Sequence, residues 1–243
     1  MDIRNKFAGM RALVTGASSG IGTAIARLFL RSGMRVVVSG RDEKRLMTLA
    51  KEYKEAVVEP ADLTDADQTI RLALNSLKHF AGLDVLVNNA GIGIKRNVIQ
   101  MDLSEFDLTL NLNLRAPFIL SKIIAAHMAE SGGGHIINIG SGASYTPIPG
   151  YAAYCASKYG LLGFSESLAL ELREKNIKVS IVMPGSVATA FGGGDPEQKL
   201  KTKPGILLPE DVARAVLFLL DQPAHAWTSQ MNLRPLNPDR RLS

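Results

Sequence analysis

Residues 11–22 read Arg-Ala-Leu-Val-Thr-Gly-Ala-Ser-Ser-Gly-Ile-Gly, and this stretch decides the fold. The apolar run that ends at Thr15 predicts a buried strand, and an apolar helical pattern starts at Ile21. The three glycines between them allow a sharp turn and a close approach of the backbone to a bound group. A strand, a glycine-rich turn and a helix form a dinucleotide site, with the pyrophosphate at the helix N-terminus. The spacing Gly-x-x-x-Gly-x-Gly differs from the general fingerprint, and plain connectors also contain such turns.

The same alternation of strand and helix continues along the chain. The apolar runs predict strands at 12–15, 35–39, 56–59, 85–88, 135–139, 179–183 and 231–233. Helical patterns occupy 21–31, 43–54, 65–80, 104–131, 152–174 and 209–220. Apolar strands that alternate with helices predict an α/β, doubly wound Rossmann fold, with a seven-stranded, mostly parallel sheet covered by helices on both faces. Nothing in the composition divides residues 1–243, so we expect one dinucleotide-binding catalytic domain.

Tyr154 and Lys158 are candidates for acid–base chemistry because they stand four residues apart in a helical pattern. Residues i and i+4 share one face of a helix, so the phenol and the ammonium point into the same space. A neighbouring cation favours the phenolate, so we expect Lys158 to lower the pKa of Tyr154 toward the working range. Ser141, at the end of a predicted strand, is a candidate to hold a substrate oxygen beside the phenol. Tyr-x-x-x-Lys alone is a weak signal, because both residues are common on helices.

A set of motifs taken together resembles the short-chain dehydrogenase/reductase family over roughly residues 7–233. The set comprises Thr15-Gly16-Ala17-Ser18-Ser19-Gly20-Ile21-Gly22, Asn88-Asn89-Ala90-Gly91, Asn113, Ser141, Tyr154-x-x-x-Lys158 and Pro184-Gly185, in this order. The resemblance implies hydride transfer between a nicotinamide and a carbonyl carbon, with Tyr154 as general acid/base. It implies the catalytic residues Asn113, Ser141, Tyr154 and Lys158.

The resemblance also assigns residues to the cofactor. They are Gly16, Ser18, Ser19, Gly20, Ile21 and Gly22 in the first turn, the adenine pair Asp62 and Leu63, Asn89, Ala90 and Gly91 after the fourth strand, Pro184, Gly185, Val187 and Thr189 at the nicotinamide, and Tyr154 and Lys158. Lys158 is expected to bind the nicotinamide ribose as well. Where NAD-preferring members carry Asp, this chain has Gly40, followed by Arg41. Because a guanidinium binds phosphate in bidentate fashion, we expect NADP(H), with Arg41 on the 2′-phosphate. Alternatively, Arg41 merely begins the next helix.

Asn111 and Ser144 are alternatives to two of the catalytic candidates, and Pro117 lies close in the sequence to a third point of interest, the Asn113 carbonyl. Asn111 competes with Asn113, and Ser144 competes with Ser141, but the family phrasing and spacing favour Asn113 and Ser141. In an α-helix Pro117 leaves the Asn113 carbonyl without its usual donor, because proline has no N–H. The family's proton relay uses a water on that carbonyl, so Pro117 either keeps it available or is an ordinary helix kink.

The composition of the chain limits the partners and the compartment that we expect for the protein. The chain has 243 residues, one cysteine and a net charge of +5, so no internal disulfide is expected. The basic residues are scattered and do not alternate with aromatics, which argues against nucleic acid. The N-terminus lacks an apolar signal region, and no run approaches a membrane span. We therefore expect a soluble cytoplasmic protein without a membrane partner or a metal. The resemblance implies a homodimer or homotetramer that packs the helices at 104–131 and 152–174.

The leading functional hypothesis is an NADPH-dependent reductase of a ketone or a 3-oxo compound. The alternatives are a 3-oxoacyl-[acyl-carrier-protein] reductase and a non-catalytic NADP(H)-sensing protein. Residues 231–235 resemble a subgroup acting on 3-hydroxy acids or small carbonyls, and they lack the Asp-Gly-Gly ending common in the fatty-acid reductases. Two irregular connections, 140–150 and 185–208, are predicted to line the substrate. Because the second contains Gly192-Gly193-Gly194, we expect a flexible lid at about 186–208.

Overall fold

Within residues 6–240, the part of the chain that the computed structural model describes, seven strands form one sheet. The strands are β1 (Arg11–Thr15), β2 (Arg35–Ser39), β3 (Ala56–Val58), β4 (Val85–Asn88), β5 (Gly134–Ile139), β6 (Ile177–Pro184) and β7 (Gln230–Leu233). Their order is β3-β2-β1-β4-β5-β6-β7, and every neighbouring pair is parallel. The predicted doubly wound fold is confirmed.

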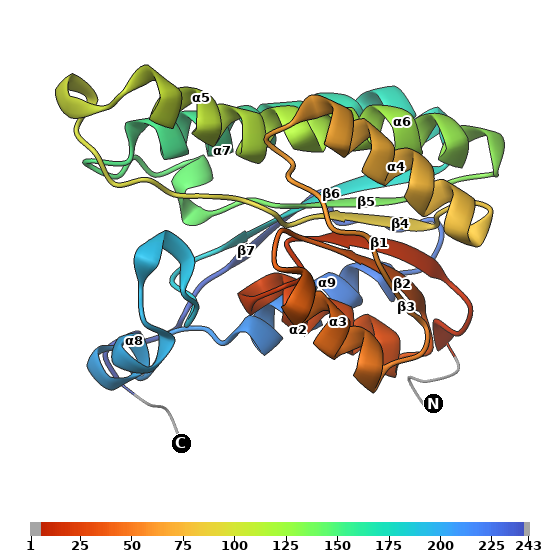
Figure 1. Cartoon of the computed structure of the whole chain (residues 1–243), viewed down its shortest axis with the longest axis horizontal. Coiled ribbons are helices and arrows are strands. Elements are labelled where there is room, and N and C mark those ends of the chain that lie inside the picture. Colours follow the sequence, from red (N-terminus) through yellow and green to blue (C-terminus); the bar gives the residue numbers. More distant parts are fainter. Residues whose placement is uncertain (1–5, 241–243) are drawn as a thin grey trace.

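Helices cover both faces of this sheet (Figure 1). They are α2 (Gly20–Arg31), α3 (Glu43–Glu52), α4 (Ala66–Phe80), α5 (Leu103–Leu110), α6 (Ala116–Glu130), α7 (Ala152–Leu172), α8 (Pro196–Thr202) and α9 (Pro209–Leu220). One face carries α4, α5, α6 and α7, and the other carries α2, α3 and α9. The short helix α8 lies beyond the carboxyl ends of the strands.

The alternation of side chains along each strand divides the core between the two faces. In β1, Val14 packs with α2 residues such as Ile25 and Phe29, whereas the neighbouring Leu13 packs with Leu120 on α6. Successive side chains of a strand point to opposite faces, so a strand covered on both faces must be apolar throughout. The continuous apolar runs in the sequence follow from this requirement.

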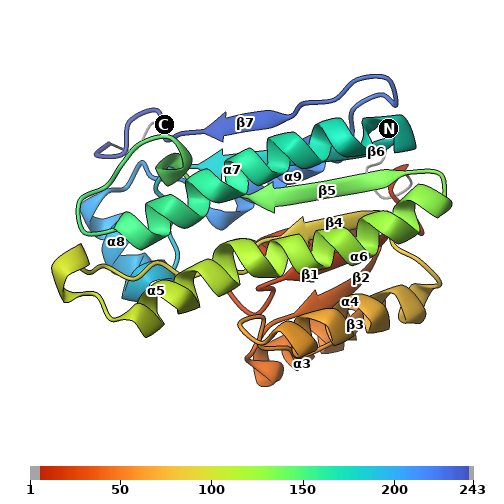
Figure 2. The same cartoon turned by 90° about the horizontal axis from the view of Figure 1, so that it is seen from above.

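The chain order reverses between β1 and β4, which are neighbours in the sheet. Ligands of doubly wound folds bind beyond the carboxyl ends of the strands at such a reversal. In Figure 2 the arrowheads of β5 and β7 point to the side on which α8 lies. The glycine-rich turn after β1 and the segments after β4, β5 and β6 therefore meet at this end of the sheet.

Two segments differ from the expectations. The predicted helix at 104–131 is interrupted, because residues Asn111–Arg115 form a π-helical segment between α5 and α6. The predicted irregular connection 185–208 contains α8, which Asp195 caps by accepting a hydrogen bond from the Glu197 N–H. The glycine content correctly marks the turn before α8, but it does not extend through the whole segment.

Candidate active site

Helix α7 holds the acid–base pair as the four-residue spacing predicts. Tyr154 and Lys158 are both buried, and Lys158 is only 4% exposed. The Lys158 Nζ lies 5.9 Å from the centroid of the Tyr154 ring. It donates a hydrogen bond of 2.8 Å to the carbonyl oxygen of Ile139, at the end of β5. The helix and the strand end therefore fix the amine next to the phenol.

Burial governs the pKa values of both groups. It lowers the pKa of the Lys158 amine to about 8, because an ammonium loses hydration inside the protein. It also raises the pKa of the Tyr154 phenol above its ordinary value, and the hydrogen bond with Ser141 opposes this rise. The expectation that the pKa of Tyr154 is lowered toward the working range is therefore wrong for this structure. Loss of water around the phenol is the larger effect, so Tyr154 is a protonated acid at neutral pH.

Ser141 lies two residues after the end of β5, and its side chain hydrogen-bonds with the Tyr154 phenol. Its Oγ accepts a hydrogen bond of 3.1 Å from the Ala143 N–H, which fixes the side chain. The rival Ser144 is fully buried, and its Oγ accepts from the Ser141 N–H at 3.3 Å. Ser144 thus supports the turn that presents Ser141. The geometry favours Ser141 of the two.

Asn113 connects three elements of the site from within the π-helical segment. Its Oδ1 accepts from the Ile92 N–H at 2.8 Å, and its Nδ2 donates to the Ile92 carbonyl at 2.8 Å. The Nδ2 also donates to the Ser157 Oγ at 3.0 Å. Asn113 is 0% exposed, whereas Asn111 lines an open groove with Leu110. The geometry therefore favours Asn113 over Asn111.

The π-helical segment changes the argument about Pro117. The Ala116 N–H donates to the Asn111 carbonyl, which is a bond to the fifth preceding residue. The uninterrupted α-helical spacing assumed between Asn113 and Pro117 therefore does not hold in this segment, and which carbonyl Pro117 leaves without a donor stays a prediction. The role of the Asn113 carbonyl in a proton relay stays a prediction.

The glycine-rich turn has the shape that a dinucleotide requires. Gly16 has φ +65°, and a Cβ on it would lie 2.8 Å from the Asn89 Nδ2. A Cβ on Gly22 would overlap the Gly16 carbonyl oxygen. Ser19 begins α2 without a side-chain cap, so the amides of the first turn are available to an anion. The residues present therefore fit a pyrophosphate at this helix end.

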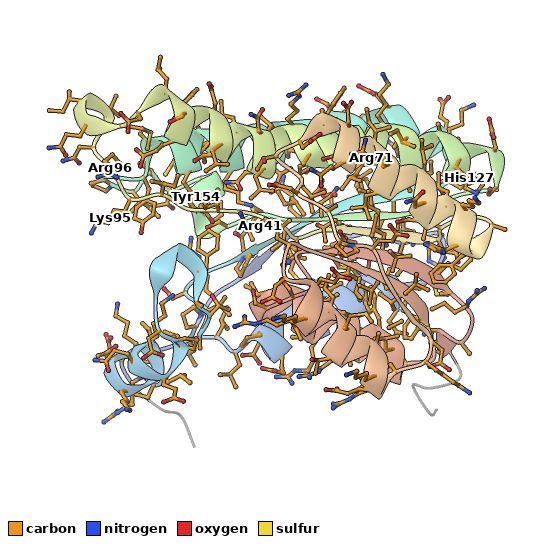
Figure 3. All side chains as sticks on the ribbon, in the orientation of Figure 1. Arg41, Arg71, Lys95, Arg96, His127 and Tyr154 are labelled. Carbon is orange, nitrogen blue, oxygen red and sulfur yellow. The ribbon has the colours of Figure 1, made fainter. Side chains whose placement is uncertain are left out.

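The end of β2 has no side chain at Gly40 and is followed by the exposed guanidinium of Arg41. A Cβ on Gly40 would lie 3.0 Å from the Ser18 Oγ, so a larger side chain at position 40 would have to displace Ser18. Arg41 is exposed, and no carboxylate of the described residues forms an ion pair with it. Figure 3 shows Arg41 at the same end of the sheet as Tyr154. This geometry fits a 2′-phosphate better than a bare ribose.

The other predicted cofactor residues lie along the same end of the sheet. Asn89 donates from Nδ2 to the Thr15 carbonyl at 2.9 Å, which ties the turn after β4 to β1. Asp62 accepts from Thr64, and its partner Leu63 is buried in the core. The segment after β6 brings Thr189 against the glycine-rich turn, because a Cβ on Gly20 would lie 3.1 Å from the Thr189 Cγ2. The geometry brings these segments together, and the cofactor contacts of all the residues predicted to bind it stay predictions.

Sequence reasoning missed two polar residues that hold the site together. Ser157 donates to the Tyr154 carbonyl at 2.7 Å and accepts from Asn113, so it joins α7 to the π-helical segment. Thr15 accepts at its Oγ1 from the N–H groups of Asn89 and Ala90 at 3.0 and 3.1 Å. Ser157 lies three residues after Tyr154, and this helical phase was a signal that could have found it.

His135 is a buried structural residue. Its Nε2 lies 2.8 Å from the Ser180 Oγ between β5 and β6. Burial lowers its pKa to about 3, so the imidazole is neutral in the folded protein. Among the described residues, no three His, Cys, Asp or Glu side chains gather to hold a metal ion.

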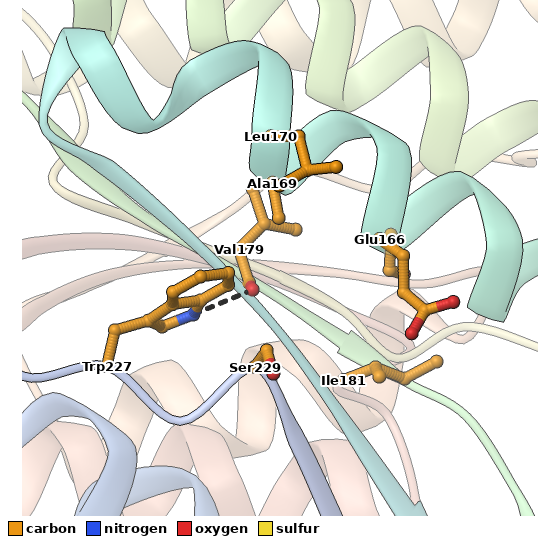
Figure 4. Close-up of a pocket in the computed structure, with 8 residues that line it drawn as sticks. Glu166, Ala169, Leu170, Val179, Ile181, Trp227 and Ser229 are labelled. Atoms are coloured by element: carbon orange, nitrogen blue, oxygen red, sulfur yellow. Dashed lines mark hydrogen bonds between the residues drawn. The ribbon is translucent and has the colours of Figure 1, made fainter.

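A pocket of about 200 Å³ lies away from the predicted site residues, between α7, β6 and the residues before β7 (Figure 4). Trp227 borders it and donates from Nε1 to the Val179 carbonyl at 2.9 Å, while Glu166 and Leu170 border it from α7. None of the predicted site residues lines this pocket. An apolar groove along α5, α6 and α7 contains Leu114, Phe118 and Phe164. The predicted homodimer or homotetramer through these helices stays a prediction.

Comparison with known proteins agrees with this geometry. A profile of the family described as short chain dehydrogenase matches residues 10–199. The 3-oxoacyl-[acyl-carrier-protein] reductase of Rickettsia typhi is 37% identical over 236 residues, covering 92% of this chain and 94% of the relative. The chain therefore belongs to the short-chain dehydrogenase family. It is an oxidoreductase of the kind that acts on CH–OH groups.

Two solved structures share the fold. The alcohol dehydrogenase of Thermococcus sibiricus, complexed with 5-hydroxy-NADP, has a TM-score of 0.87 at 26% identity and covers 96% of this chain and 99% of its own. The 3-ketoacyl-(acyl-carrier-protein) reductase of Brucella melitensis, complexed with NADH, has a TM-score of 0.87 at 29% identity and covers 95% and 99%. Across residues 6–240 of the present chain, no helix is long and apolar enough to cross a membrane.

Proposed function

We propose that the protein is an NADPH-dependent reductase that converts a ketone or a 3-oxo compound into a secondary alcohol. The observation that carries the proposal is the convergence of Ser141, Tyr154 and Lys158 beside Asn113 at the carboxyl end of the sheet. The proposal includes a cytoplasmic location.

Each residue has a defined task in this proposal. A bound reduced nicotinamide supplies the hydride that the carbonyl carbon receives. Tyr154, protonated at neutral pH, gives its proton to the carbonyl oxygen as negative charge grows there. Ser141 holds that oxygen through a hydrogen bond that strengthens as the charge develops. The ammonium of Lys158 offsets the charge left on the phenolate.

The test is NADPH consumption, followed by absorbance, across simple ketones, 3-oxo acids and 3-oxoacyl thioesters. Tyr154→Phe removes the proton donor, so the turnover rate should fall by about 10²–10⁴-fold. Tyr159→Phe is the matched control, because Tyr159 is an exposed tyrosine on the same helix and should be silent. Equal turnover by the wild type and Tyr154→Phe would contradict the proposal.

The relatives favour one particular substrate as a second candidate. Their names identify several, at 37–38% identity, as 3-oxoacyl-[acyl-carrier-protein] reductases. The C-terminal sequence argues against it, because Asp-Gly-Gly is missing around residues 231–235. Preference for a 3-oxoacyl carrier protein over the matching small thioester would select this candidate. Tight NADP(H) binding without turnover of any carbonyl would instead favour a sensing protein.

The choice of NADPH over NADH rests on Gly40 and Arg41, since one solved relative contains an NADP derivative and another contains NADH. Arg41→Asp replaces a phosphate-binding cation by an anion and should shift the preference toward NADH by about 10–100-fold. Arg45→Asp is the matched control, because Arg45 is an exposed arginine that already pairs with Asp42. The ratio of kcat/KM for the two cofactors measures the shift. An unchanged ratio in Arg41→Asp would remove Arg41 from the cofactor site.

A further inference from the structure

The side chain of Phe191 lies between two parts of the site, the loop after β4 and Tyr154. Its ring centroid is 5.6 Å from that of Tyr154, with the planes inclined by 52°. A Cβ on Gly93 would lie 2.8 Å from Cε1 and 3.0 Å from Cζ of the Phe191 ring. Figure 3 shows the Tyr154 side chain pointing from the layer of α7 toward the segment that precedes α8. The ring thus lies against Tyr154 on one side and against Gly93 on the other.

The backbone of Phe191 is held in place, although the residue is 42% exposed. The Lys199 Nζ, from α8, donates to the carbonyl oxygens of Thr189 and Phe191 at 2.8 and 3.3 Å. Gly192 and Gly193 follow with φ of +69° and +77°, which turns the chain sharply behind the ring. A half-exposed aromatic ring on a fixed backbone contributes little to the core. Its position has to be explained by what it faces.

We infer that Phe191 determines substrate size by forming the apolar wall that faces Tyr154. The inference rests on the proposed reductase function. Tyr151 packs edge-on against Tyr154 with a centroid distance of 6.1 Å, so the phenol is contacted by two aromatic rings. A carbonyl with compact or unbranched substituents fits beside such walls. A carbonyl compound with a bulky substituent has to displace the Phe191 ring. Glycine at position 93 allows the ring to take this place, because a larger side chain there would push the ring away.

The test compares acetophenone with butanone as substrates of the NADPH-loaded enzyme. Phe191→Ala should raise the ratio of their kcat/KM values by at least about tenfold, since one small group in an apolar pocket is worth about 10–200-fold. Gly93→Ala should change the ratio in the wild type and not in Phe191→Ala, because its effect acts through the ring. Phe118→Ala is the matched control, because Phe118 is a half-exposed ring on α6 that packs against Phe164.

The outcomes separate this inference from the proposed function. If Phe191→Ala lowers kcat/KM equally for both ketones, the ring has only a structural role and the inference is overturned. If the wild type turns over neither ketone nor any other carbonyl, the proposed function fails. The dissociation constants of 1-phenylethanol and 2-butanol from the NADP⁺-saturated protein, measured by calorimetry, then decide the inference. A ratio that Phe191→Ala leaves unchanged, or binding of neither alcohol by either protein, overturns it.

Discussion

The reaction site has two walls that are built in opposite ways. The buried wall consists of Asn113, Ser157 and Lys158, whose polar atoms are paired with backbone and with each other. The Phe191 wall consists of residues 189–199, where a half-exposed ring follows a backbone held by Lys199. A buried polar group is costly when it loses a partner, so the buried wall permits one geometry. Because Phe191 is half exposed, a change of its side chain should cost the rest of the fold little.

This difference predicts two kinds of variant. A change in the buried wall should reduce turnover of every substrate by the same factor. A change in the Phe191 wall should alter which substrate is preferred while chemistry at Tyr154 continues.

The largest effect is expected for Lys158→Met. The phenolate loses its counter-charge, so turnover of all carbonyls should fall by about 10³-fold or more. Burial lowers the pKa of Lys158 from 10.5 to about 8. Keeping the amine charged in the folded protein therefore reduces the free energy of unfolding, and this reduction has its full size below pH 8. Removing the charge should therefore raise the free energy of unfolding near neutral pH by about 1–3 kcal/mol, after the lost bond to Ile139 is counted.

Urea unfolding as a function of pH checks this prediction. The gain in Lys158→Met should shrink as the pH rises from about 8 toward 10.5, because the wild-type amine becomes neutral in both states. Lys122→Met, on an exposed position of α6, is the matched control. A Lys158→Met protein that is inactive and less stable than the wild type throughout this range would show that the amine stabilises the fold.

Asn113→Ala is expected to have the next largest effect. It leaves the Ile92 N–H and carbonyl without partners inside the protein, and each such group costs about 1–3 kcal/mol. The free energy of unfolding should fall by about 2–4 kcal/mol, and kcat should fall for all substrates in parallel. The loop after β4 that carries Gly93 then loses its anchor to the π-helical segment.

Asn111→Ala is the matched control, two residues earlier in the same segment. Asn111 lines the open groove along α5 and α6, so its loss should change stability by less than about 1 kcal/mol. Thermal unfolding and steady-state kinetics on both variants compare the two positions. Equal losses in Asn111→Ala and Asn113→Ala would mean that the segment as a whole, and not the Asn113 amide, supports the site.

How much of the fold and of the two walls can be predicted from the sequence depends on the interaction that determines each feature. The alternation of apolar runs predicted the fold because each strand must be apolar on both faces. The spacing of Tyr154 and Lys158 predicted their common face, since helical phase is fixed by covalent geometry. The pKa of Tyr154 was not predictable in this way, because it depends on burial by segments distant in the sequence, such as Phe191.

Two backbone features were also missed, for different reasons. The π-helical segment at 111–115 differs from an α-helix only in its hydrogen-bond register, which the pattern of side chains does not record. Helix α8 was hidden by the glycines before it, although Asp195-Pro196-Glu197 carries a helix start signal. The Phe191 wall therefore contains more regular structure than its composition indicated, and whether residues 186–208 act as a flexible lid stays a prediction.

The smallest effect is expected for Lys199→Met, which tests whether that lysine positions the Phe191 wall. The variant removes the donor to the Thr189 and Phe191 carbonyls but keeps the length of the side chain. We expect KM for small ketones to rise by about three- to tenfold with kcat nearly unchanged, since a hydrogen bond from a charged group contributes about 1.5–3 kcal/mol and only part of it is lost as the wall loosens. Lys201→Met, on the exposed side of α8, should leave both constants unchanged. A fall in kcat with constant KM in Lys199→Met would place Lys199 with the buried wall instead, because it would mean that the carbonyls it holds are needed for the chemistry at Tyr154 and not for the fit of the substrate.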